Sequence, residues 1–296
     1  MSELIPETMA IHKPKTNLLK IINNKSFNDK VLYETQSAFH NIKIIENEIG
    51  RFLHYSDTYQ AGLINTNYYQ GNLPYINYFL IPYLINPNIE KILLIGLGSG
   101  KIVNDIEVLF KKLKKIDVVD LEENITDIAQ NYFGFKPSNK FNFILQDGLT
   151  YLFNNKTKYD LIIVDVANNE GIDTRFLSPE YFTSIKKSLK KSGIFVSNMC
   201  ASPDFEHPKN YFMKQIFPIY NEFFRYNHLF KGNYSDEVYY KAFFNIDERV
   251  IDITNVIIIS TDNYKTINTT QNLINDIAKL NINIENYLKD LYQSVI

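Results

Sequence analysis

The stretch Ile95-Gly96-Leu97-Gly98-Ser99-Gly100-Lys101 decides the fold. It follows the apolar run Ile92–Ile95 and precedes an amphipathic stretch, so it predicts a strand, a tight glycine turn and a helix. Glycines let the backbone turn sharply and approach a ligand with no Cβ in the way. Because open α/β sheets bind ligands at the carboxyl ends of their strands, the stretch predicts a ligand site in an α/β domain.

Short apolar runs alternate with amphipathic stretches throughout residues Lys91 to Met199. This alternation is typical of a doubly wound, mostly parallel sheet, and continuous apolar runs indicate strands that helices cover on both faces. We expect strands at Ile92–Ile95, Ile116–Val119, Phe141–Leu145, Leu161–Val164 and Ile194–Ser197, with helices that begin near Lys101, Glu123, Gly148 and Ser178.

The sequence predicts three parts in the chain, two of them short. Residues 1–30 are expected to be a loosely packed lead-in, and residues 31–70 a small antiparallel β unit with strands at Val31–Tyr33, Phe39–Ile45 and Arg51–Tyr55. Residues 71–296 would form one nucleoside-binding catalytic domain that opens with a connecting helix over Gly71–Asn86. Beyond Pro203 we expect a helix, strands at Val238–Phe244 and Asn255–Ser260, and a last helix to about Tyr292.

Composition argues against several classes of partner. Lys and Arg total 31 against 33 for Asp and Glu, so no basic surplus exists to neutralise nucleic acid. Cys200 is the single cysteine, which excludes internal disulfides and cysteine-rich metal sites and suits a reducing, cytoplasmic compartment; we expect no metal. Met1–Lys15 has no export-type apolar run, and no apolar run reaches the ~20 residues that span a bilayer, so we expect no membrane association.

The residues around the glycine loop distinguish between nucleotide sites. A dinucleotide-binding turn requires glycine or alanine where this chain has Lys101, and a phosphate-binding P-loop requires serine or threonine where it has Ile102. Both of these interpretations are therefore disfavoured.

Carboxylates follow the next two predicted strands. Asp120, followed by Leu121, is placed to accept hydrogen bonds from ribose hydroxyls, although a solvated aspartate or helix cap is the simpler interpretation. Asp147 offers an acceptor for an adenine amino group, and Gly148 a place where the ring passes close; Asp147 alone could equally be a helix cap. Together these positions predict a site for S-adenosylmethionine or its decarboxylated form, formed by Gly96, Gly98, Ser99, Asp120, Leu121, Asp147 and Gly148.

Over roughly Val31 to Thr261 the chain resembles the polyamine aminopropyltransferases, the spermidine and spermine synthases. Gln60 stands where that family carries a glutamine in its β unit, and Tyr159–Asp165 resembles the strand that ends in the family's catalytic aspartate. Phe176–Phe182, Leu189 and Gly193–Val196 resemble the helix and strand that follow. The resemblance implies a Rossmann-like sheet of the S-adenosylmethionine-dependent transferase type after a small β unit. It also implies Gln60 in the donor site, Asp165 as the catalytic residue, a small amine substrate and a homodimer.

Three expected acids are missing from this pattern. Ser99 and Asn168 stand where aspartates are usual, and Leu73–Asn77 contains no carboxylate. The chain thus resembles a divergent, spermidine-synthase-like branch, in which Pro74-Tyr75, Gly96-Leu97-Gly98 and Asn198 have counterparts.

The chemistry of amine transfer suggests a role for Asp165. A primary amine has a pKa of about 10, so a carboxylate is needed to orient and deprotonate it, and burial at a strand end would raise the pKa of that carboxylate. Glu170 and Asp173 could replace the missing second acid. Tyr68, Tyr69 and Tyr75 could line an alkyl channel, with ordinary packing as the simpler interpretation. The predicted acceptor site therefore contains Tyr75, Asn168 and Glu170.

Three functions stay open from the sequence. The first is an aminopropyltransferase that uses decarboxylated S-adenosylmethionine and putrescine or a related amine. The second is a methyltransferase that uses intact S-adenosylmethionine, which Leu94 disfavours because most methyltransferases of this fold carry an acid there. The third is a nucleoside-binding protein without turnover.

Overall fold

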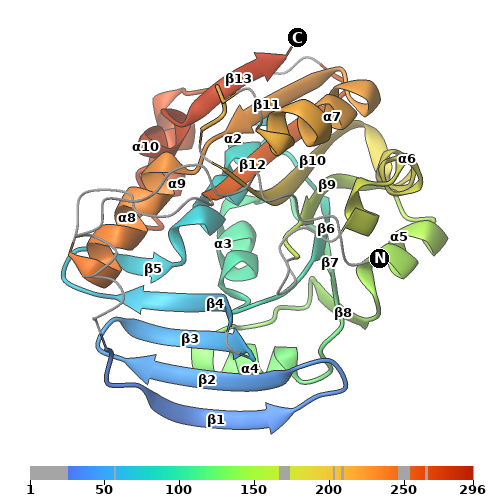
Figure 1. Cartoon of the computed structure of the whole chain (residues 1–296). Coiled ribbons are helices and arrows are strands. Elements are labelled where there is room, and N and C mark those ends of the chain that lie inside the picture. Colours follow the sequence, from blue (N-terminus) through green and yellow to red (C-terminus); the bar gives the residue numbers. More distant parts are fainter. Residues whose placement is uncertain are drawn as a thin grey trace.

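Two β-sheets form the framework of the protein (Figure 1). The computed structural model describes residues 26–56, 58–166, 174–202, 204–207, 210–245, 254–263 and 266–295, so the expected lead-in lies mostly outside the described residues. The smaller sheet is antiparallel, with its five strands in chain order. These strands are β1 (Lys30–Gln36), β2 (Asn41–Asn47), β3 (Gly50–Tyr55), β4 (Thr58–Asn65) and β5 (Gln70–Asn72).

The larger sheet has eight strands in the order β13-β11-β12-β10-β9-β6-β7-β8. The five strands from β10 to β8 run parallel, and β12, β11 and β13 extend the sheet in antiparallel fashion. In chain order the strands are β6 (Lys91–Ile95), β7 (Lys115–Asp120), β8 (Phe141–Leu145), β9 (Tyr159–Val164), β10 (Leu189–Ala201), β11 (Tyr226–Phe230), β12 (Thr254–Thr261) and β13 (Leu291–Val295).

The order of the parallel strands reverses between β6 and β9. From β6 the chain proceeds outward through β7 to β8 and then returns to the other side of β6 to form β9 and β10. Such a switch point leaves a crevice at the carboxyl ends of the two central strands, because the connections leave in opposite directions. In this protein that crevice lies beside Gly96 and Asp165, which follow β6 and β9.

Helices cover both faces of the larger sheet. Alternate residues of β6 divide between the two cores: Ile92 and Leu94 pack in one, and Leu93 and Ile95 in the other. This division confirms the doubly wound α/β arrangement. The first core includes residues of η2 (Pro74–Leu80), α2 (Ile81–Ile85), α3 (Lys101–Leu109), α4 (Ile125–Phe133), α8 (Asn233–Phe244), α9 (Gln271–Ala278) and α10 (Ile284–Leu288). The second includes α5 (Gly148–Asn154), η3 (Thr174–Leu177), α6 (Pro179–Ser188), η4 (Phe212–Ile216) and α7 (Phe217–Phe223).

The secondary structure departs from the sequence-based expectation mainly outside Lys91 to Met199. The strand expected at Val238–Phe244 is wrong, because these residues form the second half of α8. The prediction that the last helix continues to about Tyr292 is also wrong at its end, because Leu291–Val295 forms β13 beside β11. Short apolar runs fit a helix and a strand equally well, and here packing between distant segments decides.

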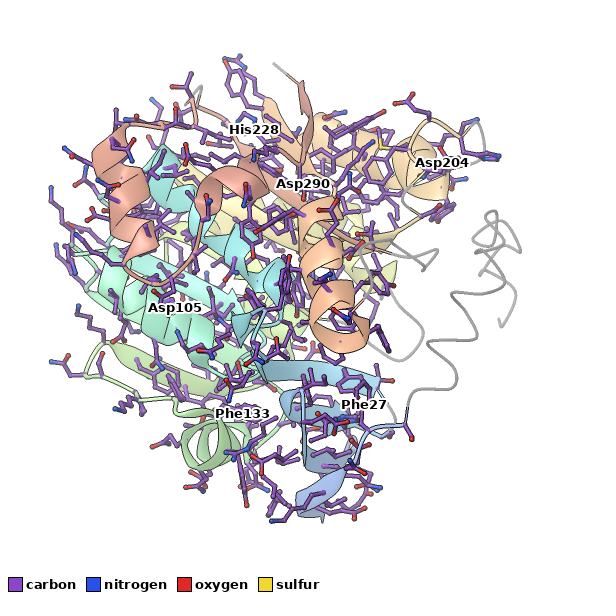
Figure 2. All side chains as sticks on the ribbon, turned by 90° about the vertical axis from the view of Figure 1, so that its left-hand side faces the viewer. Phe27, Asp105, Phe133, Asp204, His228 and Asp290 are labelled. Atoms are coloured by element: carbon purple, nitrogen blue, oxygen red, sulfur yellow. The ribbon has the colours of Figure 1, made fainter. Side chains whose placement is uncertain are left out.

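The small sheet is joined to the larger domain at several points. Arg51 donates to the carbonyl of Tyr132 at 2.7 Å, and the ring of Phe52 lies 5.3 Å from that of Phe243 on α8. Figure 1 shows α8 descending beside the larger sheet toward the small one, and Figure 2 shows Phe27 near the lower end of α8. The limits expected at residues 30 and 70 stay predictions. None of the helices within the described ranges is long and apolar enough to cross a bilayer.

Asp290, labelled in Figure 2, fixes the C-terminal segment to the elements around the crevice. Its buried carboxylate accepts hydrogen bonds from the Tyr78 hydroxyl on η2 and from the backbone N–H of Tyr234 on α8, the latter at 2.7 Å. One side chain therefore positions both η2 and α8.

Tyr78→Phe should lower the free energy of unfolding by about 1–3 kcal/mol, because a buried carboxylate loses a hydrogen-bond donor. Tyr83→Phe is the matched control: its hydroxyl donates at 2.8 Å to Asp276, whose side chain is 38% exposed and stays solvated. The control should therefore cost less than about 1 kcal/mol. Urea unfolding of both variants checks this, and equal losses would contradict the anchoring role of Asp290.

Candidate active site

A cavity of about 700 Å³ lies at the crevice between β6 and β9. Every predicted site residue within the described ranges lies on its wall, namely Gln60, Tyr75, Gly96, Gly98, Ser99, Asp120, Leu121, Asp147, Gly148 and Asp165. Asn168, Glu170 and Asp173 lie outside the described residues. The fold thus brings together side chains from four strand ends, η2 and the small sheet.

The glycine loop packs against the residue that follows β9. The backbone N–H of Asp165 donates to the carbonyl of Ile95 at 3.0 Å. Gly96 has φ of +94°, and a Cβ there would lie 2.3 Å from the carbonyl oxygen of Asp165. Only glycine allows both the conformation and the approach. Gly96 therefore allows the glycine loop to pack directly against Asp165.

Asp120 has a structural role as well as a place on the cavity wall. One carboxylate oxygen accepts from the backbone N–H of Leu97 at 2.8 Å, and the other from that of Glu122 at 3.0 Å. Burial raises the pKa of this carboxyl group, and these two backbone donors oppose the shift. Because each carboxylate oxygen has two acceptor positions, Asp120 can hold the glycine loop and still accept from a ligand.

Asp147 and Gly148 also have structural roles. Asp147 is the N-cap of α5, where one oxygen accepts from the backbone N–H and the hydroxyl of Thr150, both at 2.9 Å. A Cβ on Gly148 would lie 2.5 Å from the side chain of Ile95, so packing against β6 explains this glycine. The simpler interpretation of Asp147 as a helix cap is therefore correct, and contact with adenine stays a prediction.

Asp165 is held between two hydrogen-bond donors. The Tyr75 hydroxyl donates to one carboxylate oxygen at 3.3 Å, and the Asn198 amide to the other at 2.9 Å. Burial raises the pKa of Asp165 to about 6, and both donors oppose the shift. The pKa of Tyr75 is raised well above its usual value by burial and by Asp165, so its hydroxyl stays a donor. Within the described structure, the amide oxygen of Asn198 is buried and accepts no hydrogen bond.

The three tyrosines expected in an alkyl channel have different environments. Tyr75 lies on the cavity wall, whereas Tyr68 is exposed and the Tyr69 hydroxyl accepts from Asn77 at 3.1 Å. Ordinary packing thus accounts for Tyr69.

The small sheet supplies wall residues that the sequence analysis missed. His40 stacks on Tyr55, with ring centroids 4.5 Å apart, and its Nδ1 lies 2.5 Å from a carboxylate oxygen of Glu122. Ala61 on β4 approaches Gly98, where a Cβ would lie 3.1 Å from its side chain. These contacts join residues 15 to 82 positions apart, for which a single sequence offers no local signal.

Another part of the cavity wall comes from α8, the end of β10 and the start of β12. It includes Ser235, Asp236 and Tyr239 of α8, together with Cys200 and Asn255. The sequence analysis missed this wall because it assigned part of α8 to a strand.

The cavity wall is acidic. Its described residues include the carboxylates of Asp120, Glu122, Asp147, Asp165 and Asp236 against a single guanidinium, that of Arg175. Such a surface favours a positively charged ligand. Across the described residues, no three His, Cys, Asp or Glu side chains are grouped so as to hold a metal ion.

Comparison with known proteins relates this chain to one family. The model of the spermine/spermidine synthase domain matches residues 79–227. A polyamine aminopropyltransferase of Clostridium botulinum is 29% identical over 184 residues, which cover 60% of this chain and 62% of that protein. One from Alkaliphilus metalliredigens is 31% identical over 149 residues, which cover 47% of this chain and 52% of that protein. The matches thus span less than two thirds of these relatives.

Solved structures of spermidine synthases have a similar fold. A spermidine synthase in complex with the transition state analogue AdoDATO superposes with a TM-score of 0.65 at 16% identity, over 89% of this chain and 85% of that one. The spermidine synthase of Thermotoga maritima gives a TM-score of 0.63 at 16% identity and the same coverage. The Rossmann-like sheet with a small N-terminal β-sheet is therefore a fold that these proteins share.

Gly96→Ala should be far more damaging than Gly134→Ala. Both glycines have positive φ, but a Cβ on Gly134 meets nothing within 4 Å, so its cost is the conformational strain of about 1–2 kcal/mol. At Gly96 the clash with Asp165 adds to this strain, and we expect at least about 2 kcal/mol more. Chemical unfolding measures both, and equal losses would show that the two strand ends need no close approach.

Proposed function

The chain belongs to the spermine/spermidine synthase family, and from this premise we propose that it transfers the aminopropyl group of decarboxylated S-adenosylmethionine to putrescine or a related amine. The observation that carries the proposal is the environment of Asp165. A carboxylate with a pKa of about 6 lies in an acidic cavity beside a buried amide oxygen, that of Asn198, which no described group satisfies. An amine nitrogen offers the N–H donors and the charge that both groups lack.

The nucleoside part of the donor would lie between the glycine loop and the small sheet. We assign the ribose hydroxyls to Asp120 and the adenine to the region of Leu121, Asp147 and Gly148, which lie on the cavity wall at the ends of the neighbouring strands β7 and β8. Gln60 would close this side from β4, and Ser99 would lie beneath the donor at the glycine loop. The sulfonium would then face Asp165, because Gly96 holds the two strand ends together.

Asp165 would act as general base and orient the acceptor. It takes a proton from the amine, whose free electron pair attacks the carbon beside the sulfonium. The carbon–sulfur bond breaks, and its electron pair stays on sulfur, so that neutral methylthioadenosine leaves. Tyr75 and Asn198 hold the two oxygens of Asp165 in place, and the free amide oxygen of Asn198 can accept from the same nitrogen.

Mass analysis of products with each donor tests the reaction. The purified chain is incubated with putrescine and either decarboxylated or intact S-adenosylmethionine. We expect spermidine and methylthioadenosine from the decarboxylated donor. Methylated amine and S-adenosylhomocysteine from the intact donor would overturn the proposal in favour of methyl transfer.

Asp120→Asn should weaken methylthioadenosine binding by about 1.5–3 kcal/mol, because a charge-assisted acceptor for the ribose is lost. Asp127→Asn is the control, since Asp127 is an exposed aspartate of α4 away from the cavity. Calorimetric titration gives both affinities. Unchanged binding by Asp120→Asn would remove Asp120 from the nucleoside site.

Asp165→Asn should lower kcat by at least about 100-fold and leave methylthioadenosine affinity within a few-fold. Only ionised Asp165 can accept a proton, so the wild-type rate should rise with pH through about 6, the pKa of Asp165, and the variant should lose this dependence. Asp160→Asn, at the opposite end of β9, is the matched control and should keep both the rate and the pH profile. Nearly full activity of Asp165→Asn would exclude this carboxylate as the base.

A further inference from the structure

Helix α3 carries a buried carboxylate one turn after the glycine loop, that of Asp105, which Figure 2 labels. Asp105 is 3% exposed. One of its oxygens pairs with the ammonium of Lys101, the first residue of α3, and the other accepts from the amide of Asn72 at 3.4 Å. Burial raises the pKa of Asp105, and both partners oppose this shift. The carboxylate therefore joins α3 to a residue 33 positions away in the chain.

Asn72 ends β5 and leads directly into the segment that carries Tyr75. It is 3% exposed, and a buried amide without a partner is costly. Among the described residues, Asp105 is the one hydrogen-bond partner of the Asn72 side chain, whose amide oxygen is buried and accepts nothing. The position of this asparagine therefore depends on Asp105.

The chain between Asn72 and Tyr75 is stiff. Pro74 fixes its own φ and restricts the residue before it to extended conformations. Leu73 accordingly has φ of −51° and ψ of 129°. The backbone N–H of Ile76 donates to the carbonyl of Leu73 at 3.1 Å, which closes the first turn of η2. A displacement of Asn72 would therefore be passed on to Tyr75 rather than absorbed between them.

Tyr75 acts in turn on Asp165. Its hydroxyl donates to the carboxylate at 3.3 Å and thereby favours the charged form, as the Asn198 amide does from β10. The other titratable group near Asp165 among the described residues is Cys200, also on β10. Burial and the negative charges of Asp165 and Asp236 raise the pKa of this thiol to about 11, so it is uncharged. A change in the position of Tyr75 therefore changes the titration of Asp165 directly.

We propose that Asp105 is a positioning residue, which through Asn72 holds the Tyr75 hydroxyl against the proposed base. Its ion pair with Lys101 ties the same segment to the end of the glycine loop. The effect on turnover rests on the proposed function, because Asp105 itself does not line the cavity. A simpler role is an ion pair that stabilises α3 alone, since residues four apart on a helix face each other.

The direction in which the titration of Asp165 moves distinguishes these two roles. If Tyr75 is displaced, Asp165 loses a donor to its charged form, and the pKa of Asp165 rises. If Asp105→Asn only removes a negative charge, the pKa of Asp165 falls or stays, because a carboxylate ionises more readily when a like charge is absent. The two effects have opposite signs.

NMR titration of protein labelled with carbon-13 at its aspartate carboxyl groups measures this pKa, and the Asp165 signal is identified by its loss in Asp165→Asn. Asp105→Asn should raise the titration midpoint by about 0.5–1 pH unit, the scale of one weakened hydrogen bond to a charged group. Asn72→Ala should raise it too, because this change cuts the same link and keeps the ion pair. In a Tyr75→Phe background, neither change should raise the midpoint further.

Asp117→Asn is the matched control. Asp117 is also buried, pairs with a lysine and accepts from an asparagine amide, but it lies on β7 and its third partner is Tyr159 at the start of β9. The control removes the same kind of carboxylate and leaves the segment that carries Tyr75 intact. It should keep the midpoint of Asp165 within about 0.2 pH unit of the wild type.

A midpoint that falls or stays in Asp105→Asn would overturn the inference, as would a rise that persists in full in the Tyr75→Phe background. Thermal melting identifies a variant that does not fold, and Asn72→Ala, which keeps both charges of the ion pair, then decides.

With decarboxylated donor and putrescine, Asp105→Asn should also lower kcat at least about 5-fold and leave methylthioadenosine affinity within a few-fold. An unchanged kcat would exclude a role in the reaction. A wild-type protein without turnover, in which Asp105→Asn still raises the Asp165 midpoint, would overturn the proposed function and leave the positioning of Tyr75 standing.

Discussion

The close approach of two backbones at the centre of the sheet is the constraint on which the rest of the site depends. Gly96 and Asp165 follow neighbouring parallel strands, and the missing Cβ of Gly96 allows the carbonyl of Asp165 to pack against the glycine loop. In the proposed reaction, a nucleoside at the loop and an amine at the carboxylate would therefore meet at the same end of the sheet. Proximity of this kind is a large part of what an enzyme contributes to a two-substrate reaction.

Burial and hydrogen bonding oppose each other at Asp165, and their balance suits proton transfer. Burial disfavours the charged carboxylate, whereas the donors from Tyr75 and Asn198 favour it, and the resulting pKa of about 6 lies below neutral pH. The carboxylate is therefore ionised at neutral pH and still basic enough to accept a proton. A fully solvated aspartate would be ionised too, but it would be a weaker base.

The sequence predicted the part of the fold that local patterns specify. The five strands between Lys91 and Met199 and the cap of α6 by Ser178 follow from apolar runs, glycine and proline, and the structure has them all. The sequence analysis missed β4, although it pairs with its chain neighbours β3 and β5. It also missed β11 and β13, which pair with strands far apart in sequence, and the helical state of Val238–Phe244. The predicted site residues that the structure describes share one cavity, but His40 and Asp236 were missed because their sequence neighbours give no sign of the contact.

The cavity wall comes both from the segment that the family model matches and from residues outside it. The glycine loop, Asp120, Asp147 and Asp165 all come from residues within the family match, so in the proposed reaction the matched part of the chain would hold the donor. Asp236 comes from a helix beyond that match, which Asp290 and Gly232 fix in place through buried contacts. The cavity wall is therefore acidic in a chain with Ser99 and Asn168 in place of aspartates, because α8 adds the carboxylate of Asp236 to those from the matched segment.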